Sequence, residues 1–388
     1  MISSRFDSRL LFYLLAASIC SMMVSLFLLQ LFLGLLAFLW LFEKTGNKKK
    51  AFDIFTLLIA VFGIIRILSI IFSVYPASSV QSLYKEALFY LGFLSMSFYL
   101  KAMNKEKIEK IAFTFPISSI AVALIGLTLF NLRLVERAES FSTGYATFSS
   151  YLLAAAGVYI ALPFSNKKKI NWLLWSAGLS IIFSAIITSL GRTNIAIAAL
   201  LFITGLIFRK IKIKPAVVII FLTAIISLLS FQNNKLLLTR RVENPTGLSD
   251  RDIIWKGFQT LKFQHPFLGF GPRTFHDIFP YVNQLGDKLT GSWHNDFIQM
   301  YFESGALGLL SFTVLIFIVI YFSVVYLKKA GQTNNSRNII LGVLLGTSAL
   351  VLSSLTAGFI SSPVLSIAFA FLISLLSSVI FYTNSQPG

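Results

Sequence analysis

The polar stretch 231–296 holds the residues best suited to chemistry, including all three histidines: His265, His276 and His294. His294 ends the stretch just before an apolar run, and a histidine at the rim of a membrane-facing cavity can act as a general base near neutral pH. A loop histidine can equally be an ordinary surface residue. His265 precedes a Gly-rich turn and is interpreted as structural, and His276 has no distinguishing context.

Arg192 lies in a tight turn, Gly191-Arg192-Thr193-Asn194, between two apolar runs. Thr193 or Asn194 can cap the helix that follows. The free N–H groups of that helix start and the guanidinium together would make an anion site suited to phosphate. The alternative is an interfacial arginine that reaches toward lipid headgroups.

Arg251 lies in a second predicted helix start. Ser249-x-x-Asp252 matches a capping box, and Ile254, Phe258 and Leu261 follow on one face until Pro266 ends the helix. Arg251 would then lie in the first turn, near exposed N–H groups, as a second phosphate-binding arginine. The alternative is that it pairs with a neighbouring aspartate, Asp250 or Asp252.

Other charged residues complete the candidate set. Isolated cations on the same predicted side of the membrane would hold a phosphate strongly in a low dielectric; they are Arg66, Lys85, Arg133 and Arg137. Glu303 is interpreted as orienting other groups and not as the base. No metal site is predicted, because the histidines are 11 and 18 residues apart and lack acidic ligands at suitable spacing. No cofactor is expected.

Composition places these residues in a membrane protein. The chain of 388 residues is 56% hydrophobic and only 12% charged, against about 25% charged in soluble domains. The net charge of +18 is concentrated in short clusters between apolar runs. This is the pattern of membrane topology, and it argues against nucleic-acid binding. One cysteine, Cys20, excludes a disulfide within the chain.

Apolar runs of about 20 residues predict about twelve spans. The run 10–42 is too long for one span and is divided at its polar residues, Ser25 and Gln30, into two short ones. The other spans are expected at 51–72, 84–99, 111–130, 145–164, 170–190, 193–208, 215–230, 297–327, 339–360 and 364–382. The fold class is therefore an all-α polytopic membrane protein, with residues 1–388 forming one integral membrane domain.

The basic residues predict the orientation of these spans. One set of short loops holds 20 Lys and Arg, and the short loops on the other side hold few. Since positive loops stay cytoplasmic, both termini are expected in the cytoplasm. The long loop 231–297, between the ninth and tenth spans, would then be periplasmic and would contain short helices.

Four motifs in this order resemble the O-antigen ligase and O-antigen polymerase superfamily of bacterial envelope proteins. They are Thr188-Ser-Leu-Gly-Arg192-Thr-Asn, Ser249-Asp-Arg251-Asp-Ile-Ile-Trp255, His265-Pro-Phe-Leu-Gly-Phe-Gly271, and His294-Asn-Asp-Phe-Ile-Gln followed by Glu303-Ser-Gly305. Many relatives carry a second histidine directly before the His-Asn pair, where this chain has Trp293.

The resemblance implies a metal-independent, inverting glycosyltransferase in the bacterial inner membrane. Its donor would be a glycan on undecaprenyl pyrophosphate, and its acceptor lipid A-core or a growing glycan. Arg192 and Arg251 would bind and stabilise the pyrophosphate leaving group, and His294 would deprotonate the acceptor hydroxyl. Further contacts to pyrophosphate or glycan would come from the outer cations named above, Asn295 and Glu303.

Two alternatives remain open. A repeat-unit polymerase of the same superfamily would use a similar site, although polymerases often have two substantial outer loops and this chain has one. A transporter or flippase would show internal repeats and helices broken at mid-membrane. The sequence shows neither feature, but Arg66 within an apolar run keeps this alternative in view.

Overall fold

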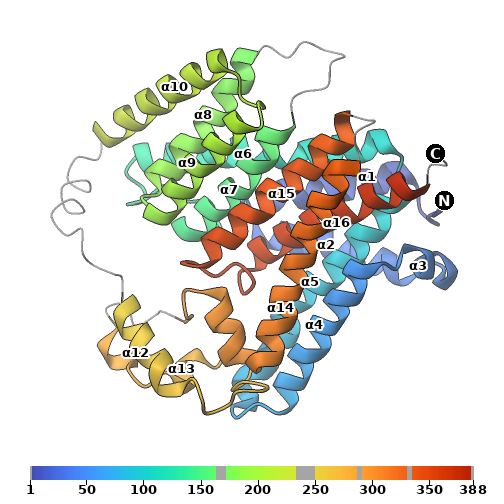
Figure 1. The fold of residues 1–388 in the computed structure, drawn as a ribbon, viewed down its shortest axis with the longest axis vertical. Coiled ribbons are helices and arrows are strands. Elements are labelled where there is room, and N and C mark those ends of the chain that lie inside the picture. Colours follow the sequence, from blue (N-terminus) through green and yellow to red (C-terminus); the bar gives the residue numbers. More distant parts are fainter. Residues whose placement is uncertain (1, 163–171, 233–249, 286–290, 330–333, 386–388) are drawn as a thin grey trace.

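The computed structural model describes residues 2–162, 172–232, 250–285, 291–329 and 334–385. Every regular element in these ranges is helical (Figure 1). The first eight helices are α1 (Ser8–Ser21), α2 (Leu26–Leu41), α3 (Thr45–Ala51), α4 (Ile54–Ile71), α5 (Pro76–Ala102), α6 (Lys105–Asn131), α7 (Tyr145–Ala161) and α8 (Trp172–Thr188). The others are α9 (Arg192–Ile207), α10 (Ile213–Gln232), α12 (Arg251–Leu261), α13 (Phe275–Ile278), η1 (Val282–Gln284), α14 (Asp296–Lys329), α15 (Asn334–Ser354) and α16 (Pro363–Ser385).

The long apolar run at the N-terminus forms two helices, as predicted. α1 ends at Ser21, and α2 begins after Ser25, whose hydroxyl accepts a hydrogen bond from the Leu28 N–H at 3.3 Å. Ser25 is therefore the N-cap of α2, which explains why it divides the run. Gln30, the other polar residue of the run, lies exposed within α2.

Six of the helices are long and apolar enough to cross a membrane, or seven if the bent pair α2 and α3 counts as one span, among the residues that the structure describes. They are α4, α6, α10, α14, α15 and α16. Four shorter helices, α1, α7, α8 and α9, are also apolar. Each of the twelve predicted spans overlaps one helix, but the number that crosses the bilayer stays a prediction.

Three predicted boundaries are wrong. Residues 76–79 are not a loop, because α5 begins at Pro76; proline at the first position of a helix loses no internal hydrogen bond. The basic residues 105–110 form the first turns of α6, so the connection from α5 is shorter than predicted. The eleventh predicted span ends earlier, at Ser354, and a turn follows it to Ser362.

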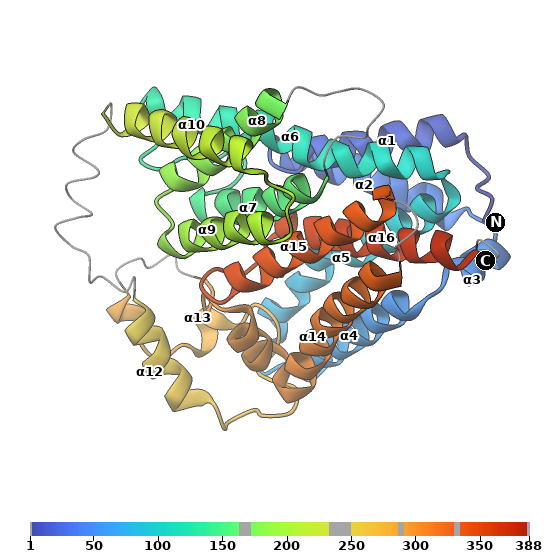
Figure 2. The same cartoon turned by 45° about the horizontal axis from the view of Figure 1, so that its top comes forward.

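The centre of the bundle is α16, which packs against α5, α7, α14 and α15 and is almost entirely buried (Figures 1 and 2). Beside it, α7 and α15 approach very closely. A Cβ at Gly157 would lie 2.7 Å from the backbone nitrogen of Gly346, so this crossing requires glycine. Small residues at such crossings let backbones pack without a side chain between them.

The segment between α12 and α13 docks into a break in α14. Ser304 and Gly305 have non-helical backbone angles, and Gly305 has φ +64°. Because the helix is interrupted here, its neighbouring backbone groups bond to the segment instead. Phe270 N–H donates to Phe302 O at 2.7 Å, and Ala306 N–H donates to Pro266 O at 2.7 Å.

The same segment also bonds to the start of α5. Its Phe270 carbonyl accepts from Val74 N–H and from the Ser73 hydroxyl, and its Pro272 carbonyl accepts from the Ser79 hydroxyl at 3.0 Å. His265 lies at the edge of this segment, with its ring against Phe270. This contact agrees with the structural role predicted for His265.

The part of the long loop that the structure describes has a small core of its own. Its buried residues are Ile254, Leu261, Phe270, Phe275, Phe279, Leu285, Trp293 and Phe302, the last from α14. Trp293 stacks on Phe302 with 3.9 Å between ring centroids. The loop is therefore held to α14 by aromatic packing as well as by backbone hydrogen bonds.

A buried ion pair joins α4 and α5 at the opposite end of α5. Lys101 Nζ lies 2.9 Å from the carboxylate of Asp53 and 2.6 Å from the carbonyl of Ala51. Burial acts to raise the pKa of Asp53, but Lys101 and the hydroxyl of Ser377 hold it below its usual value of 3.8. Asp53 therefore stabilises the fold above its usual pKa, and this contribution is lost as the pH falls through the lower folded value.

We expect Gly305→Ala to destabilise the protein by more than about 2 kcal/mol, because the residue would be held at positive φ and its methyl group would overlap the carbonyl of Phe267. Thermal unfolding of the purified protein measures this. Gly34→Ala in α2 is the matched control, since a Cβ there meets nothing within 4 Å. Equal unfolding temperatures for the two variants would contradict the close docking of the loop segment.

Candidate functional site

One pocket of about 170 Å³ brings together the three residues predicted to do chemistry. It lies where the starts of α7, α9, α12 and α14 meet the end of α15. Its lining residues are Arg137, Tyr145, Ala146, Ser149, Leu190, Gly191, Arg192, Thr193, Asn194, Arg251, His294, Thr356 and Ala357. Among the residues that the structure describes, the lining contains three arginines and a histidine but no carboxylate.

Arg192 is the first residue of α9, with Gly191 as the N-cap. Glycine has no side chain that could cap the helix, and Thr193 and Asn194 lie inside the first turn of α9. The prediction that Thr193 or Asn194 caps α9 is therefore wrong. Within the described part of the chain, no capping side chain bonds to the first-turn N–H groups of α9. The positive end of the helix dipole adds to the charge of the exposed Arg192 guanidinium.

Asn194 forms the floor of the pocket and not a cap. Its side-chain nitrogen donates to the Ser149 hydroxyl at 2.6 Å and to Ser150 at 3.3 Å, and its oxygen accepts from the Ser353 hydroxyl at 2.8 Å. These bonds tie α9 to α7 and α15 in a buried setting, where every satisfied polar group adds rigidity. The start of α9, and Arg192 with it, is fixed against both neighbours.

Arg137 enters the pocket from the connection between α6 and α7. Its guanidinium carbon lies 3.9 Å from the centre of the Tyr145 ring, a distance typical of a cation–π contact. The adjacent Ala138 N–H donates to the Thr188 carbonyl at the end of α8. The backbone bond and the ring together place the Arg137 charge near Arg192.

Arg251 is the first residue of α12, in the first turn as predicted. One of its terminal nitrogens donates to the Thr356 carbonyl at 3.2 Å. Among the residues that the structure describes, no ion pair joins Arg251 to Asp250 or Asp252. Ser249, the first residue of the predicted capping box, lies outside the described residues, and α12 ends at Leu261, before Pro266.

His294 stands between two anchored neighbours. Trp293 on one side is buried in the core of the loop. On the other side the Asn295 side chain accepts hydrogen bonds from the N–H groups of Phe297 and Ile298, and so caps α14. The imidazole is therefore attached to a short backbone stretch that is fixed at both ends, and Trp293 in place of a histidine acts as an anchor.

Left-handed backbone occurs beside each of the three candidate residues. Leu190 (φ +58°) lies two residues before Arg192, Asp250 (φ +61°) lies one residue before Arg251, and His294 itself has φ +49°. Such angles cost about 1–2 kcal/mol in residues other than glycine. Strain of this kind tends to gather at functional sites, where it sets the direction of a side chain.

The turn between α15 and α16 closes the pocket, and sequence reasoning missed it. The buried carboxylate of Asp296 accepts from the Phe359 N–H at 2.7 Å and from the Ile360 N–H at 3.4 Å. The Asn295 side chain donates to the Leu355 carbonyl at 3.2 Å. The residues directly after His294 thus hold the same turn whose Thr356 binds Arg251.

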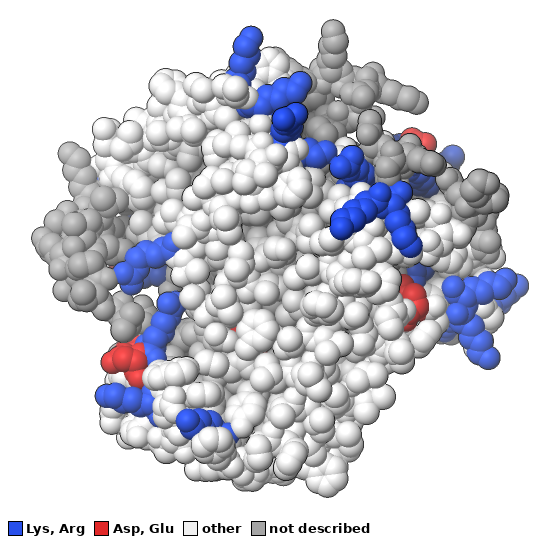
Figure 3. Space-filling view, in the orientation of Figure 1, with Lys and Arg blue, Asp and Glu red and all other residues white. Residues whose placement is uncertain are grey.

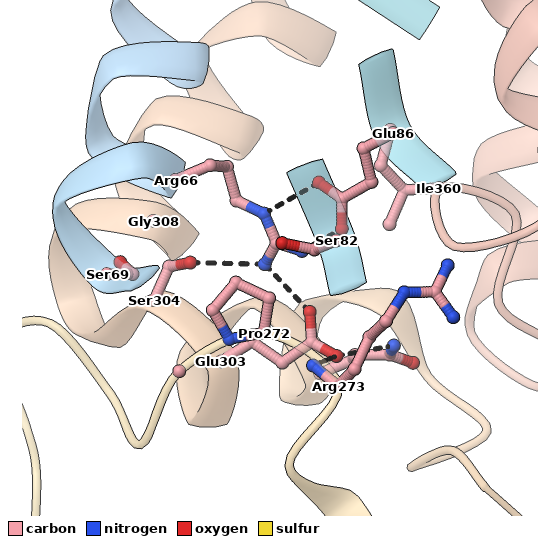
Figure 4. Close-up of polar contacts among 12 residues, drawn as sticks. Arg66, Ser69, Ser82, Glu86, Pro272, Arg273, Glu303, Ser304, Gly308 and Ile360 are labelled. Carbon is pink, nitrogen blue, oxygen red and sulfur yellow. Dashed lines mark hydrogen bonds and ion pairs between the residues drawn. The ribbon is translucent and has the colours of Figure 1, made fainter. Parts of the chain in front are cut away.

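Arg66 lies apart from this pocket, in a buried ion-pair network that Figure 4 shows. Its guanidinium contacts Glu86 at 2.5 Å and Glu303 at 2.7 Å, and it donates to the Ser304 hydroxyl at 3.1 Å. Glu303 also accepts from the backbone N–H of Arg273 in the loop. The network therefore joins α4, α5 and the loop at the break in α14.

The remaining candidates also lie outside the pocket lining. Lys85 is exposed on α5 and contacts Gln81, and Arg133 is exposed after α6. Asn295 caps α14, and Glu303 belongs to the network around Arg66. His276 is exposed in α13. Among the described residues no group of three or more His, Cys, Asp or Glu side chains is arranged to hold a metal ion.

Part of the chain matches a known protein family. Residues 177–313 match the family model described as O-Antigen ligase, so the resemblance to that superfamily is confirmed over this stretch. The matched part runs from α8 into α14 and contains Arg192, Arg251 and His294. No curated protein matches the chain. Together with the apolar helices, the match indicates a multi-pass membrane protein.

We expect Asp296→Asn to loosen the turn between α15 and α16, because an amide presents only one acceptor to the Phe359 and Ile360 N–H groups. Hydrogen bonds to charged groups contribute about 1.5–3 kcal/mol. Hydrogen exchange of those two amides is therefore expected to accelerate. Asp277→Asn, in exposed α13, is the control, and equal exchange in both variants would show that Asp296 does not hold the turn.

Proposed function

We propose, on the premise that residues 177–313 belong to the O-antigen ligase family, that the protein is a glycosyltransferase. It moves a glycan from undecaprenyl pyrophosphate to an acceptor hydroxyl, with lipid A-core as the favoured acceptor, on the periplasmic side of the bacterial inner membrane. The observation that carries the proposal is the single pocket lined by Arg192, Arg251 and His294, which come from distant parts of the chain.

The charge of the pocket suits a pyrophosphate. Three guanidinium groups line it, from Arg137, Arg192 and Arg251. Arginine presents paired N–H donors that match phosphate oxygens. The helix starts of α9 and α12 add partial positive charge from two directions.

The reaction needs charge stabilisation and a base. The acceptor oxygen attacks the anomeric carbon while the bond from that carbon to the pyrophosphate oxygen breaks on the opposite face, which inverts the configuration. The leaving pyrophosphate takes the bonding electron pair, and the arginines stabilise its charge. The imidazole of His294 takes the proton of the acceptor hydroxyl.

His294 is well supported for this role by its surroundings. Trp293 and Asn295 fix the backbone on both sides, and the left-handed angle at His294 sets the direction of the side chain. A base that is held in place loses little entropy when the acceptor arrives. Glu303, in contrast, is engaged with Arg66 and Gln299, away from the pocket.

Purified protein supplied with undecaprenyl pyrophosphate-linked glycan and lipid A-core is expected to produce glycan attached to lipid A. His294→Gln is expected to lower the transfer rate by about 10²–10⁴-fold, the usual contribution of a general base. His276→Gln, which changes an exposed loop histidine, is the matched control.

Three results would redirect this proposal. A longer lipid-linked glycan without transfer to lipid A would indicate a repeat-unit polymerase, in which a growing glycan is the acceptor. Full activity of His294→Gln would remove the general-base role. Loss of activity in EDTA, with recovery on addition of a divalent ion, would overturn the metal-independent mechanism.

Arg192→Lys and Arg251→Lys are each expected to lower kcat/KM for the lipid-linked donor by about 10²-fold, because lysine keeps the charge but loses the paired donors. Arg9→Lys, on an exposed residue of α1 outside the pocket lining, is the control and should behave as wild type. The measurement is initial rate against donor concentration. Unchanged donor kinetics in both pocket variants would show that these residues do not bind the pyrophosphate.

A further inference from the structure

An apolar groove of about 630 Å³ lies among α2, α3, α4 and α5, and the proposed transfer reaction does not use it. It is bounded on one side by the short helix α3, which turns by 115° from α2. Its lining residues are Trp40, Thr45, Lys48, Lys49, Ala51, Phe52, Thr56, Ala60, Leu94, Ser97 and Phe98. The lining is thus mostly hydrocarbon and aromatic, with two adjacent lysines on α3.

The groove lies at the opposite end of the molecule from the pocket. The first turn of α5 bonds to the loop through Ser79, and its last turn bonds to Asp53 through Lys101. The groove contacts α5 near that last turn, at Ser97 and Phe98. In Figures 1 and 2, α3 lies beside both chain termini and far from α12 and α13.

Of the three lysines of α3, one is held by contacts within the protein and two are exposed to a ligand. Lys48 Nζ donates to the Leu41 carbonyl at 2.9 Å and lies 4.5 Å from the centre of the Trp40 ring. Lys49 and Lys50 are exposed. Figure 3 shows α3 within the side of the molecule where Lys and Arg gather, so an anionic group at the groove would meet a positive potential.

The surroundings of the groove favour a lipid over a water-soluble partner. About half of the residue is exposed at Phe38 on α2, at Phe42 directly after α2, at Phe52 before α4 and at Leu57 on α4. Large apolar side chains exposed beside an apolar groove are expected to face hydrocarbon in a membrane protein. A ligand in the groove would therefore have its apolar part in the membrane and its charged part beside α3.

We propose that this groove binds an anionic glycerophospholipid. One acyl chain lies along Trp40, Leu94 and Phe98, and the phosphate lies beside Lys49 of the lining, where the exposed Lys50 that follows it in the chain adds positive charge. Such a lipid would contact α2, α3, α4 and α5 together. It would therefore join the first two helices, α1 and α2, to the rest of the bundle. The site is distinct from any donor-lipid site at the arginine pocket, because the two share no lining residue.

Photoreactive phosphatidylglycerol tests the proposal with the full-length protein in neutral detergent. Crosslinks are mapped by mass spectrometry and are expected on residues of the groove lining. Lys49→Gln/Lys50→Gln is expected to weaken labelling about 30-fold, since each lysine near a lipid surface contributes about a factor of five. Lys328→Gln/Lys329→Gln, which removes two adjacent exposed lysines at the end of α14, should leave labelling of the groove unchanged.

A second variant tests the apolar half of the site. Ala60→Trp fills the groove without changing its charge, and it is also expected to abolish labelling there, while circular dichroism and size-exclusion chromatography confirm the fold. Photoreactive phosphatidylcholine should label the groove far more weakly than phosphatidylglycerol. Equal labelling by the two lipids, or wild-type labelling in Lys49→Gln/Lys50→Gln, would overturn the proposal. Because binding is measured without glycan transfer, failure of the proposed reaction would not affect this result.

Discussion

The break in α14 at Ser304 and Gly305 is the interaction on which the functional end of the molecule depends. In a continuous helix the backbone N–H and C=O groups would bond to one another, and none would be left to bond to the loop. Because the helix is interrupted, Phe302 and Ala306 bond to the loop segment instead. Backbone N–H and C=O groups without hydrogen-bond partners are costly in this apolar setting. The loop segment supplies partners for the groups at the break, and the break supplies partners for the loop segment.

Arg66 reinforces this junction from inside the bundle. Its guanidinium pairs with Glu86 and Glu303, and Glu303 in turn accepts from the loop backbone at Arg273. Removing Arg66 would leave Glu86 and Glu303 in a buried setting without their shared positive partner, which costs far more than the pair gains. From this junction α14 runs back to its start, where Asn295 and Asp296 hold the turn that binds Arg251.

Much of the site follows from local sequence. Arg192 and Arg251 stand at helix starts, and His294 stands where a polar stretch meets an apolar one, so each can be found from its immediate neighbours. The all-helical fold and the division of the N-terminal apolar run follow from hydropathy and from Ser25. The family match over residues 177–313 agrees with motifs that are visible in the same stretch.

What the sequence does not reveal is pairing over long distances. Arg66 and Glu303 are 237 residues apart, and Asp296 and Phe359 are 63 apart, so no local pattern links them. Asn194 has the residue type of a helix cap, but buried serines on α7 and α15 compete for its amide more effectively than the start of α9. Arg66 attracts attention as an intramembrane charge, and only the fold shows which acids neutralise it.

The left-handed residue at His294 also limits how this chain can change in length. From the buried Trp293 to the cap at Asn295 there is a single residue, and its backbone angle determines where the imidazole projects. An insertion or deletion between these anchors would rotate the ring out of the pocket even if every side chain were retained. Variation in loop length is therefore tolerated only on the N-terminal side of Trp293, where added residues leave this spacing intact.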